Sequence, residues 1–184
     1  MKRSIIVLSI LLITGCSISK EKLDYIENLS IKIGEEIPNI TEYINNYENL
    51  KDDIDDLVFD IETTDNKIYN VGTYEGKFKY NDEDISVKLE VIDDESPVIE
   101  DIDDITITVG DTIDLLSKVK VTDNSKDDLD IKIIGEYDNN KVGTYDLSVS
   151  VIDKGNNESS RDFKLIVKEK PKVVSVSLTT DIED

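Results

Sequence analysis

The chain has little of several residue types that carry chemistry in proteins. It contains no His and no Trp, and it has one Cys, three Pro and eight Gly among 184 residues. Without His, the commonest general base and metal ligand is missing. One Cys can form neither an intramolecular disulfide nor a cysteine zinc cage. These absences argue against catalysis by a nucleophile paired with His and against a structural zinc site.

Positive charge is also scarce. The chain has 21 Lys and Arg against 42 Asp and Glu, a formal net charge of −21. Nucleic-acid binding requires a basic surface, so we expect no nucleic-acid partner. Adjacent acid pairs such as Asp52-Asp53 and Asp103-Asp104 are expected by chance among so many acids, and we interpret them as solvated surface. We therefore expect that the protein is not an enzyme.

What is abundant favours strands. Ala and Gln are absent, whereas there are 27 Ile. Ile is common in strands and Ala is the strongest helix former, so this composition predicts a β protein. Hydrophobic residues make up 38% of the chain, which is too many for an acidic disordered sequence.

The N-terminus has the pattern of an export signal. Lys2 and Arg3 precede an apolar run from Ile5 to Ile13, interrupted only by Ser9. This run is too short to span a bilayer. We expect residues 1–15 to be a signal peptide.

The end of this signal, Ile13-Thr14-Gly15-Cys16, resembles a bacterial lipobox. The resemblance implies cleavage between Gly15 and Cys16 and a diacylglycerol on the Cys16 thiol. It places the protein on the extracytoplasmic face of a cell membrane, and the composition, typical of an AT-rich genome, favours a Gram-positive surface. An ordinary secretory signal or an uncleaved anchor is the alternative. Residues 16–22 are then the lipidated Cys and a short tether.

The rest of the chain contains an internal repeat. Val71-Gly72-Thr73-Tyr74 recurs as Val142-Gly143-Thr144-Tyr145, 71 residues later, and the segment 33–37 recurs in similar form at 109–113, 76 residues later. A repeat of this length indicates domain duplication. We expect domains at 23–94 and 95–170 and a C-terminal tail at 171–184.

Apolar and polar residues alternate through most of both repeats, as in half-buried strands. The alternating segments are 29–33, 59–61, 74–80, 85–91, 105–109, 119–121, 129–133, 145–151 and 163–167. Short strands separated by polar turns predict antiparallel β-sandwiches. The exception is the segment 41–57, which lacks this alternation and for which we predict a loop with one or two helical turns.

The second repeat resembles a bacterial surface Ig-like domain. The resemblance rests on the order and spacing of four segments, which are Pro97-Val98-Ile99, Ile107-Thr108-Val109-Gly110-Asp111, Val121-Thr122-Asp123-Asn124, and Val142-Gly143-Thr144-Tyr145 with its following strand. It implies an all-β chain of two tandem Ig-like antiparallel β-sandwiches. On this fold we expect Gly72 and Gly143 to adopt turn conformations. We expect Tyr74 and Tyr145 to form tyrosine corners, with each hydroxyl bound to backbone.

The resemblance implies a binding or adhesion module on the cell surface, with a protein or glycan partner. Three alternatives stay open. The chain could be an accessory or inhibitory subunit of an exported or cell-envelope complex, a carbohydrate-binding module, or a spacer.

Calcium is the one cofactor for which the sequence offers ligands. Asp93, Asp94 and Glu95 stand together just before Pro97, loosely similar to the acidic linkers of cadherin-type tandem sandwiches. Carboxylate oxygens suit Ca²⁺, and weak calcium sites are common in extracellular modules. With Asp123 and Asp153 these residues form a candidate Ca²⁺ site, the alternative being a solvated linker without a specific ligand.

Overall fold

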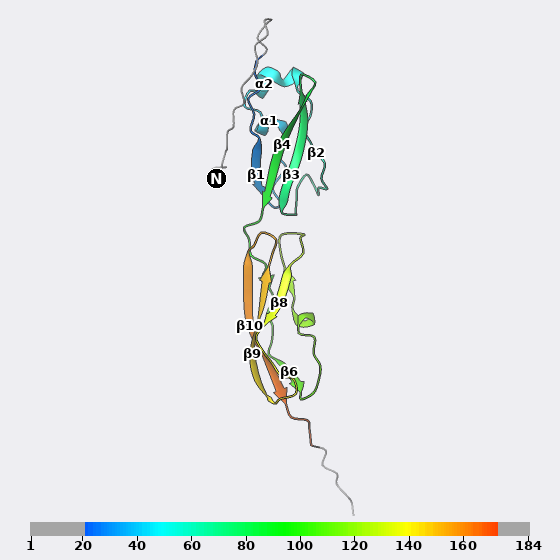
Figure 1. Cartoon of the computed structure of the whole chain (residues 1–184), viewed down its shortest axis with the longest axis vertical. Helices are drawn as coiled ribbons and strands as arrows, with labels where there is room; N and C mark the ends of the chain where they lie inside the picture. Colours follow the sequence, from blue (N-terminus) through cyan, green and yellow to red (C-terminus); the bar gives the residue numbers. More distant parts are fainter. Residues whose placement is uncertain (1–20, 173–184) are drawn as a thin grey trace, which may run out of the picture. The chain divides into compact units, whose positions relative to one another are not determined.

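The computed structural model describes residues 21–172, so the predicted signal peptide, Gly15, Cys16 and nearly all of the tail lie outside the described residues. Strands dominate, as expected (Figure 1). They are β1 Asn28–Lys32, β2 Val58–Phe59, β3 Gly72–Tyr80, β4 Glu83–Ile92, β5 Val98–Ile99, β6 Ile105–Thr108, β7 Val121–Thr122, β8 Asp130–Ile134, β9 Gly143–Ile152 and β10 Glu158–Lys168. The all-β fold class is confirmed.

Contacts group the chain into two units that do not follow the sequence order. The first unit holds the described residues 21–98 together with Val121–Asp130 and Val151–Ser159. The second unit holds the segments Ile99–Lys120 and Ile131–Ser150 and the described residues 160–172. The domain boundary near residue 94 stays a prediction.

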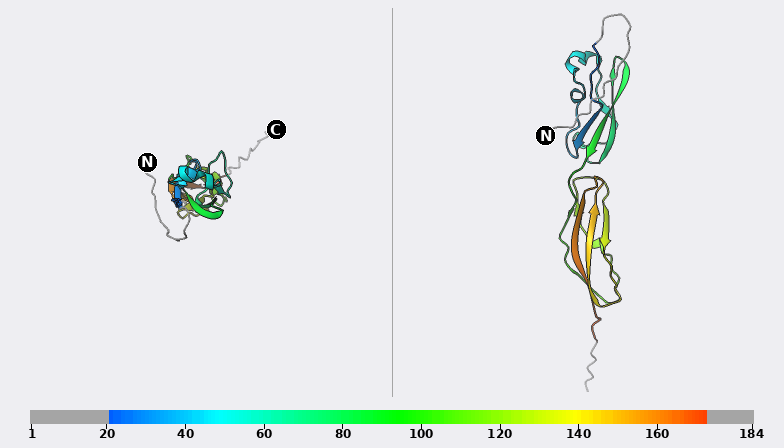
Figure 2. Two further views of the ribbon diagram at one scale, coloured as in Figure 1. Left: turned by 90° about the horizontal axis from the view of Figure 1, so that it is seen from above. Right: turned by 60° about the vertical axis from the view of Figure 1, so that its left-hand side comes forward.

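The first sheet has the strand order β1-β4-β3-β2. The three longer strands lie side by side in both side views (Figures 1 and 2). β3 and β4 form an antiparallel hairpin in which Tyr80 pairs with Glu83. Asn81 and Asp82, between these two residues, both have positive φ angles of 51° and 66°. Asn and Asp tolerate this conformation best among residues with a Cβ, so the sequence permits a two-residue turn here.

The other layer of this core comes from the segment between β1 and β2 and contains short helices, α1 Ile40–Tyr43, α2 Tyr47–Leu50 and the 3₁₀ turn η1 Lys51–Asp53. Asn39 and Glu42 close a capping box at the start of α1. Tyr43 is fully buried and its hydroxyl donates to the Lys88 carbonyl of β4 at 3.1 Å. The predicted loop with helical turns is confirmed.

The second four-stranded sheet has the order β6-β10-β9-β8, and β5 pairs with β7 in a separate two-stranded sheet. Alternate residues of β9 and β10 are buried at 5% exposure or less: Leu147, Val149, Val151, Phe163, Leu165 and Val167. This is the period-2 burial expected of strands with one face covered.

Two strand pairs differ from the antiparallel expectation. β1 runs parallel to β4, with Leu29 opposite Leu89, and β6 runs parallel to β10, with Ile107 opposite Val167. Alternation of apolar residues reports which face is buried and does not report strand direction, so the sequence could not distinguish these pairings.

The expected role of two glycines is wrong. Gly72 and Gly143 are the first residues of β3 and β9, and the glycines with positive φ are Gly34, Gly110 and Gly135. A Cβ at Gly72 would touch the Tyr74 ring at 3.4 Å, and one at Gly143 would lie 3.6 Å from the Tyr145 ring. These are ordinary van der Waals distances, so neither the backbone conformation nor the space at these two positions requires glycine.

Within residues 21–172, no helix has the length and apolar character needed to cross a membrane.

Candidate metal centre

Three aspartates stand at the same place relative to a strand. Asp93 follows β4, Asp123 follows β7, and Asp153 follows β9, and each is preceded two residues earlier by Val. Because these three strand ends lie in the first unit, the fold brings together residues that are 30 positions apart in the sequence.

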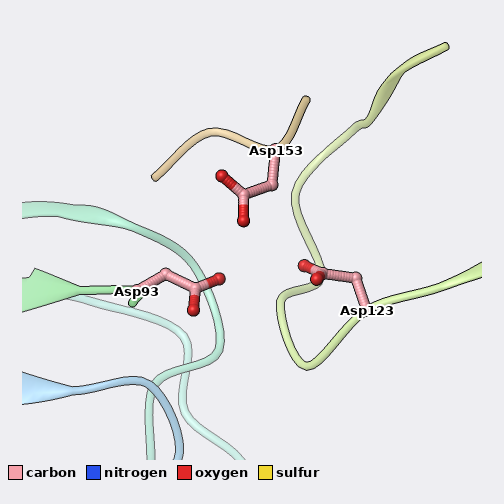
Figure 3. Close-up of side chains that lie close together, drawn as sticks. All are labelled: Asp93, Asp123 and Asp153. Atoms are coloured by element: carbon pink, nitrogen blue, oxygen red, sulfur yellow. The ribbon is translucent and has the colours of Figure 1, made fainter. Parts of the chain in front are cut away.

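The three carboxylates face a common space (Figure 3). One oxygen from each lies within 4.8 Å of the others. Asp93 is only 7% exposed and Asp153 only 5%, and Asp123 is half-buried. Three negative charges are thus held close together and largely away from water.

Hydrogen bonds hold each carboxylate in place. Asp93 Oδ1 accepts from the Glu95 amide at 3.0 Å and from Asn124 Nδ2 at 3.1 Å. Asp153 accepts from the Asn157 amide and from Asn157 Nδ2, each at 2.8 Å. The remaining aspartate also accepts a backbone donor, since the amide of residue 125 lies 3.1 Å from its Oδ2.

Two carboxylate oxygens are left without a partner. Asp93 Oδ2 and Asp123 Oδ1 are buried and accept no hydrogen bond from the described residues. A buried, unpaired carboxylate oxygen is costly, so such atoms call for a proton or a cation. The pKa of Asp123 is raised by burial and by the neighbouring charges of Asp93 and Asp153, although hydrogen bonds from Ser125 and Asn124 oppose this. A cation between the carboxylates would relieve the same repulsion.

The geometry fits a hard cation of the size of Ca²⁺. Ca²⁺ binds oxygen at roughly 2.3–2.6 Å, so two of its ligand oxygens are at most roughly 4.6–5.2 Å apart. One oxygen from each carboxylate lies within 4.8 Å of the others, so the three are close enough together to bind one such ion. The two unpartnered oxygens would each bind the ion as a single ligand. Because Ca²⁺ takes about 6–8 oxygens, water and backbone carbonyls would complete its shell.

A tight turn holds two of the ligands together. Asn157 Nδ2 donates to the Asp93 backbone carbonyl at 3.1 Å in addition to its bond with Asp153. A Cβ at Gly155 would lie 2.8 Å from that same carbonyl oxygen, so only glycine fits this close approach. The turn conformation itself comes from Asn156, which has a φ of +65°.

The other two predicted ligands lie outside this cluster. The Asp94 carboxylate accepts from Lys32 Nζ, and both Asp94 and Glu95 are exposed. Side chains that follow one another in an extended segment point in opposite directions, so Asp94 cannot face the same space as Asp93. Of the five predicted residues, the structure therefore brings three together. Whether they bind Ca²⁺ stays a prediction.

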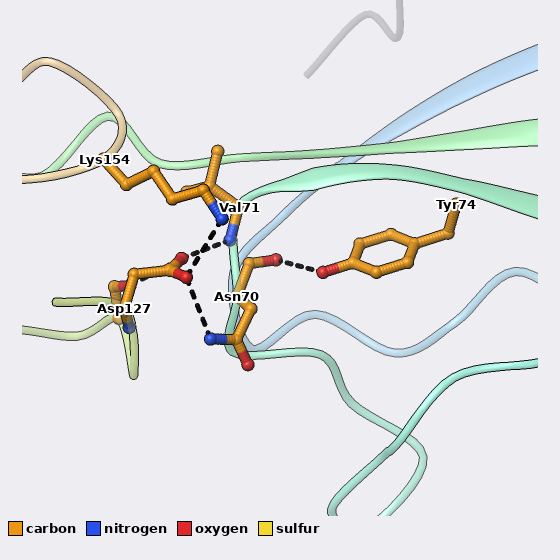
Figure 4. Close-up of polar contacts among 6 residues, drawn as sticks. Asn70, Val71, Tyr74, Asp127 and Lys154 are labelled. Carbon is orange, nitrogen blue, oxygen red and sulfur yellow. Dashed lines mark hydrogen bonds and ion pairs between the residues drawn. The ribbon is translucent and has the colours of Figure 1, made fainter.

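A fourth carboxylate, that of Asp127, belongs to the same segment as Asp123 and is paired with several donors (Figure 4). It accepts from the Val71 amide at 2.7 Å, from Asn70 Nδ2 at 3.0 Å and from Lys154 Nζ at 3.1 Å. The Ser125 hydroxyl also donates to it, at 3.2 Å. Burial tends to raise the pKa of Asp127, but these hydrogen bonds and the Lys154 charge outweigh it and hold the pKa below its ordinary value.

The tyrosine corner supports this arrangement. The Tyr74 hydroxyl donates to the Asn70 carbonyl at 2.9 Å (Figure 4). This bond holds the backbone of Asn70, whose side chain donates to Asp127. The Tyr145 hydroxyl makes the same bond to the Lys141 carbonyl at 2.9 Å. Both predicted tyrosine corners are confirmed.

Sequence reasoning missed Asp127 and the asparagines that orient the ligands. The available signal was weak, because Val-x-Asp occurs five times, at 58–60, 91–93, 109–111, 121–123 and 151–153. Only the last two are followed by Asn within four residues. Only the fold reveals that the segments of Asp93, Asp123 and Asp153 meet.

No family model matches the chain, and no curated protein matches it. Solved structures resemble the chain only at low similarity. Human mucin-like protocadherin EC1-2 has a TM-score of 0.34 and 8% identity, covering 82% of this chain and 98% of that one. Drosophila N-cadherin EC1-4 has a TM-score of 0.31 and 14% identity, covering 78% of this chain and 47% of that one. An endo-fucoidan hydrolase of glycoside hydrolase family 107 has a TM-score of 0.31 and 12% identity, covering 79% of this chain and 28% of that one. Similarity at this level does not indicate a function, and the fold class rests on the strands themselves.

Proposed function

We propose that the chain is a calcium-binding module of the extracytoplasmic cell surface, with Ca²⁺ held by Asp93, Asp123 and Asp153. The observation that carries the proposal is the pair of buried, unpartnered oxygens, Asp93 Oδ2 and Asp123 Oδ1, aimed at a common space. Clustered acids alone are common on acidic proteins. A carboxylate that is only 7% exposed and has an unpaired oxygen is not, because its desolvation is uncompensated.

The module acts by binding rather than by catalysis. The absence of His supports this, and so does the local structure, because the carboxylates are fixed by backbone and amide donors. We propose a protein or glycan partner on the cell surface, contacted in an adhesive role. The net charge of −21 favours a basic partner, or one bridged through Ca²⁺, and contact with it should weaken as salt rises.

The proposed position in the cell rests on the sequence of the N-terminus. The lipobox-like Ile13-Thr14-Gly15-Cys16 supports attachment through a lipid on Cys16. Two or more acyl chains give stable membrane attachment, whereas one chain is marginal. Labelled palmitate should enter the wild-type protein and not a Cys16→Ala variant, and equal labelling of both would refute the anchor.

Calcium titration calorimetry on the full-length protein in detergent tests the central proposal. We expect one site per chain with a dissociation constant of roughly 10⁻⁴ to 10⁻³ M, as in extracellular modules. Asp153→Asn should abolish the heat of binding. Asp128→Asn removes the same charge from an exposed position nearby and should leave the binding unchanged. Equal heats from wild type and Asp153→Asn would overturn the proposal, as would the absence of binding by the wild type.

A further inference from the structure

The Asp127 carboxylate has no direct contact with the three proposed ligands in the hydrogen bonds described above, yet it is one of the best-paired groups in the first unit. Its side chain is 11% exposed and it accepts from four donors in three separate segments. Such a network is expensive to bury unless it is complete, and this one is complete.

A short path connects Asp127 to the metal ligand Asp123. The Ser125 hydroxyl donates to Asp127 Oδ2 at 3.2 Å and accepts from the Asp127 amide at 2.9 Å. The amide of the same Ser125 donates to Asp123 Oδ2 at 3.1 Å. Asp127 thus fixes Ser125, and Ser125 fixes one oxygen of Asp123, so that Asp123 Oδ1 is left free and aimed into the cluster.

Two further contacts connect this segment to its surroundings. Lys154, which directly follows the ligand Asp153, binds Asp127 through its ammonium group. The Lys126 amide donates to the Tyr69 carbonyl at 2.8 Å, and Lys126 Nζ lies 4.7 Å from the centre of the Tyr69 ring. None of these contacts requires a cation, so the segment is held in position before any ion binds.

We propose that Asp127 is a positioning residue that forms the Asp93–Asp123–Asp153 site in advance of the cation, acting through Ser125. This inference rests on the proposed calcium function. A ligand segment that is already ordered loses little conformational entropy on binding, so the affinity for the ion is higher. Without Asp127, the 123–127 segment keeps its contacts with Tyr69 but loses those to Asn70, Val71 and Lys154. Part of its ordering then has to accompany Ca²⁺ binding, and the affinity falls by the cost of that ordering.

The test compares wild type with Asp127→Asn and Ser125→Ala in the full-length protein, with Asp128→Asn as the matched control. Calcium calorimetry should give an affinity about tenfold lower for Asp127→Asn, at the low end of the 10–100-fold range for groups that support metal ligands. Ser125→Ala should change the affinity in the same direction, because it breaks the same path. Asp128→Asn should bind as wild type does.

Hydrogen exchange separates positioning from a general loss of stability. In EDTA, the backbone amides of residues 125 and 127 should exchange faster in the Asp127→Asn variant than in wild type. At saturating Ca²⁺ their exchange should return to the wild-type rate, because the ion then orders the segment. Faster exchange that persists at saturating Ca²⁺ would mark Asp127 as merely structural and overturn the inference.

The two proposals fail in different ways. If the wild type binds no Ca²⁺, the calcium function is overturned and this inference with it. If the wild type binds Ca²⁺ and Asp127→Asn binds it equally well, only the positioning role is overturned.

Discussion

Gly155 lies against Asp93 so closely that a Cβ on Gly155 would be 2.8 Å from the Asp93 carbonyl oxygen and 3.0 Å from the Asp93 Cβ. The turn that carries the ligand Asp153 is thereby packed onto the end of the strand that carries Asp93. Because Gly155 has no Cβ, the turn can approach this closely, and this approach sets the separation of Asp93 and Asp153.

We therefore expect Gly155→Ala to weaken both folding and calcium binding. The methyl group must push the turn away from Asp93, and such overpacking costs about 1–3 kcal/mol. Thermal unfolding in EDTA measures the loss of stability, and calorimetry measures the loss of affinity. Gly110→Ala is a suitable comparison, because a methyl there, unlike one at Gly155, would displace little, the nearest atom being 3.9 Å away. The cost of Gly110→Ala comes from the φ of +89° alone. It should reduce stability and leave the calcium affinity unchanged.

Asp123→Asn should change stability in opposite directions with and without calcium. Burial and the charges of Asp93 and Asp153 raise the pKa of Asp123, so its ionised form destabilises the cation-free fold as pH rises through that pKa. An uncharged amide removes this repulsion, and its oxygen can still accept from the Ser125 amide. In EDTA at neutral pH, the melting temperature of the variant should rise by about 2 °C.

With calcium present, the order should reverse. A ligand at 100 times its dissociation constant stabilises the wild type by about 2.7 kcal/mol, and the variant should gain almost none of this. A variant that is less stable than wild type in EDTA would contradict the charge-repulsion argument.

The two tyrosine corners give a matched pair of variants. Tyr74→Phe and Tyr145→Phe each remove one hydroxyl that donates to a backbone carbonyl at 2.9 Å. Each should cost about 1 kcal/mol of unfolding free energy. Only Tyr74→Phe should also lower calcium affinity, since Tyr74 fixes Asn70, which binds Asp127. Equal calcium affinities in the two variants would show that the Tyr74 corner does not contribute to calcium binding.

The pH dependence of stability should report Asp127. Hydrogen bonds and Lys154 hold its folded pKa below its ordinary value, so its contribution to stability is complete above about pH 4 and is lost as pH falls through the folded pKa. In EDTA between pH 5 and pH 2, the melting temperature of wild type should therefore fall more steeply than that of Asp127→Asn. Parallel curves would show that the network contributes no proton-linked stability.

The sequence predicted the strands well where one face of a sheet is buried. The alternation in β3, β4, β9 and β10 reports burial directly, so these elements lie where expected. The hydroxyl partners of Tyr74 and Tyr145 could also be predicted, because the bond spans only four residues. The parallel pairing of β1 with β4 could not, since it joins strands about 60 residues apart through contacts that leave no local pattern.

Only part of the candidate site was predictable, because its ligands come from three segments that are distant in sequence. The sequence predicts Asp93, Asp123 and Asp153 as ligands, but proximity along the chain also suggests Asp94 and Glu95, whose side chains are exposed in the structure. Asp127 gave no signal, because its role depends on contacts from Asn70 and Lys154 that only tertiary structure creates.

The parallel pairing of β1 and β4 has a mechanical consequence. In a parallel pair, the end where the chain enters β1 and the end where it leaves β4 lie at opposite ends of the ladder. A pull on these two ends therefore loads the pairs from Asn28–Lys88 to Lys32–Ile92 in shear, so that they must break together and cannot unzip one at a time. The parallel β6–β10 pair has the same geometry, so a pull on the chain before β6 and after β10 loads that ladder in shear as well.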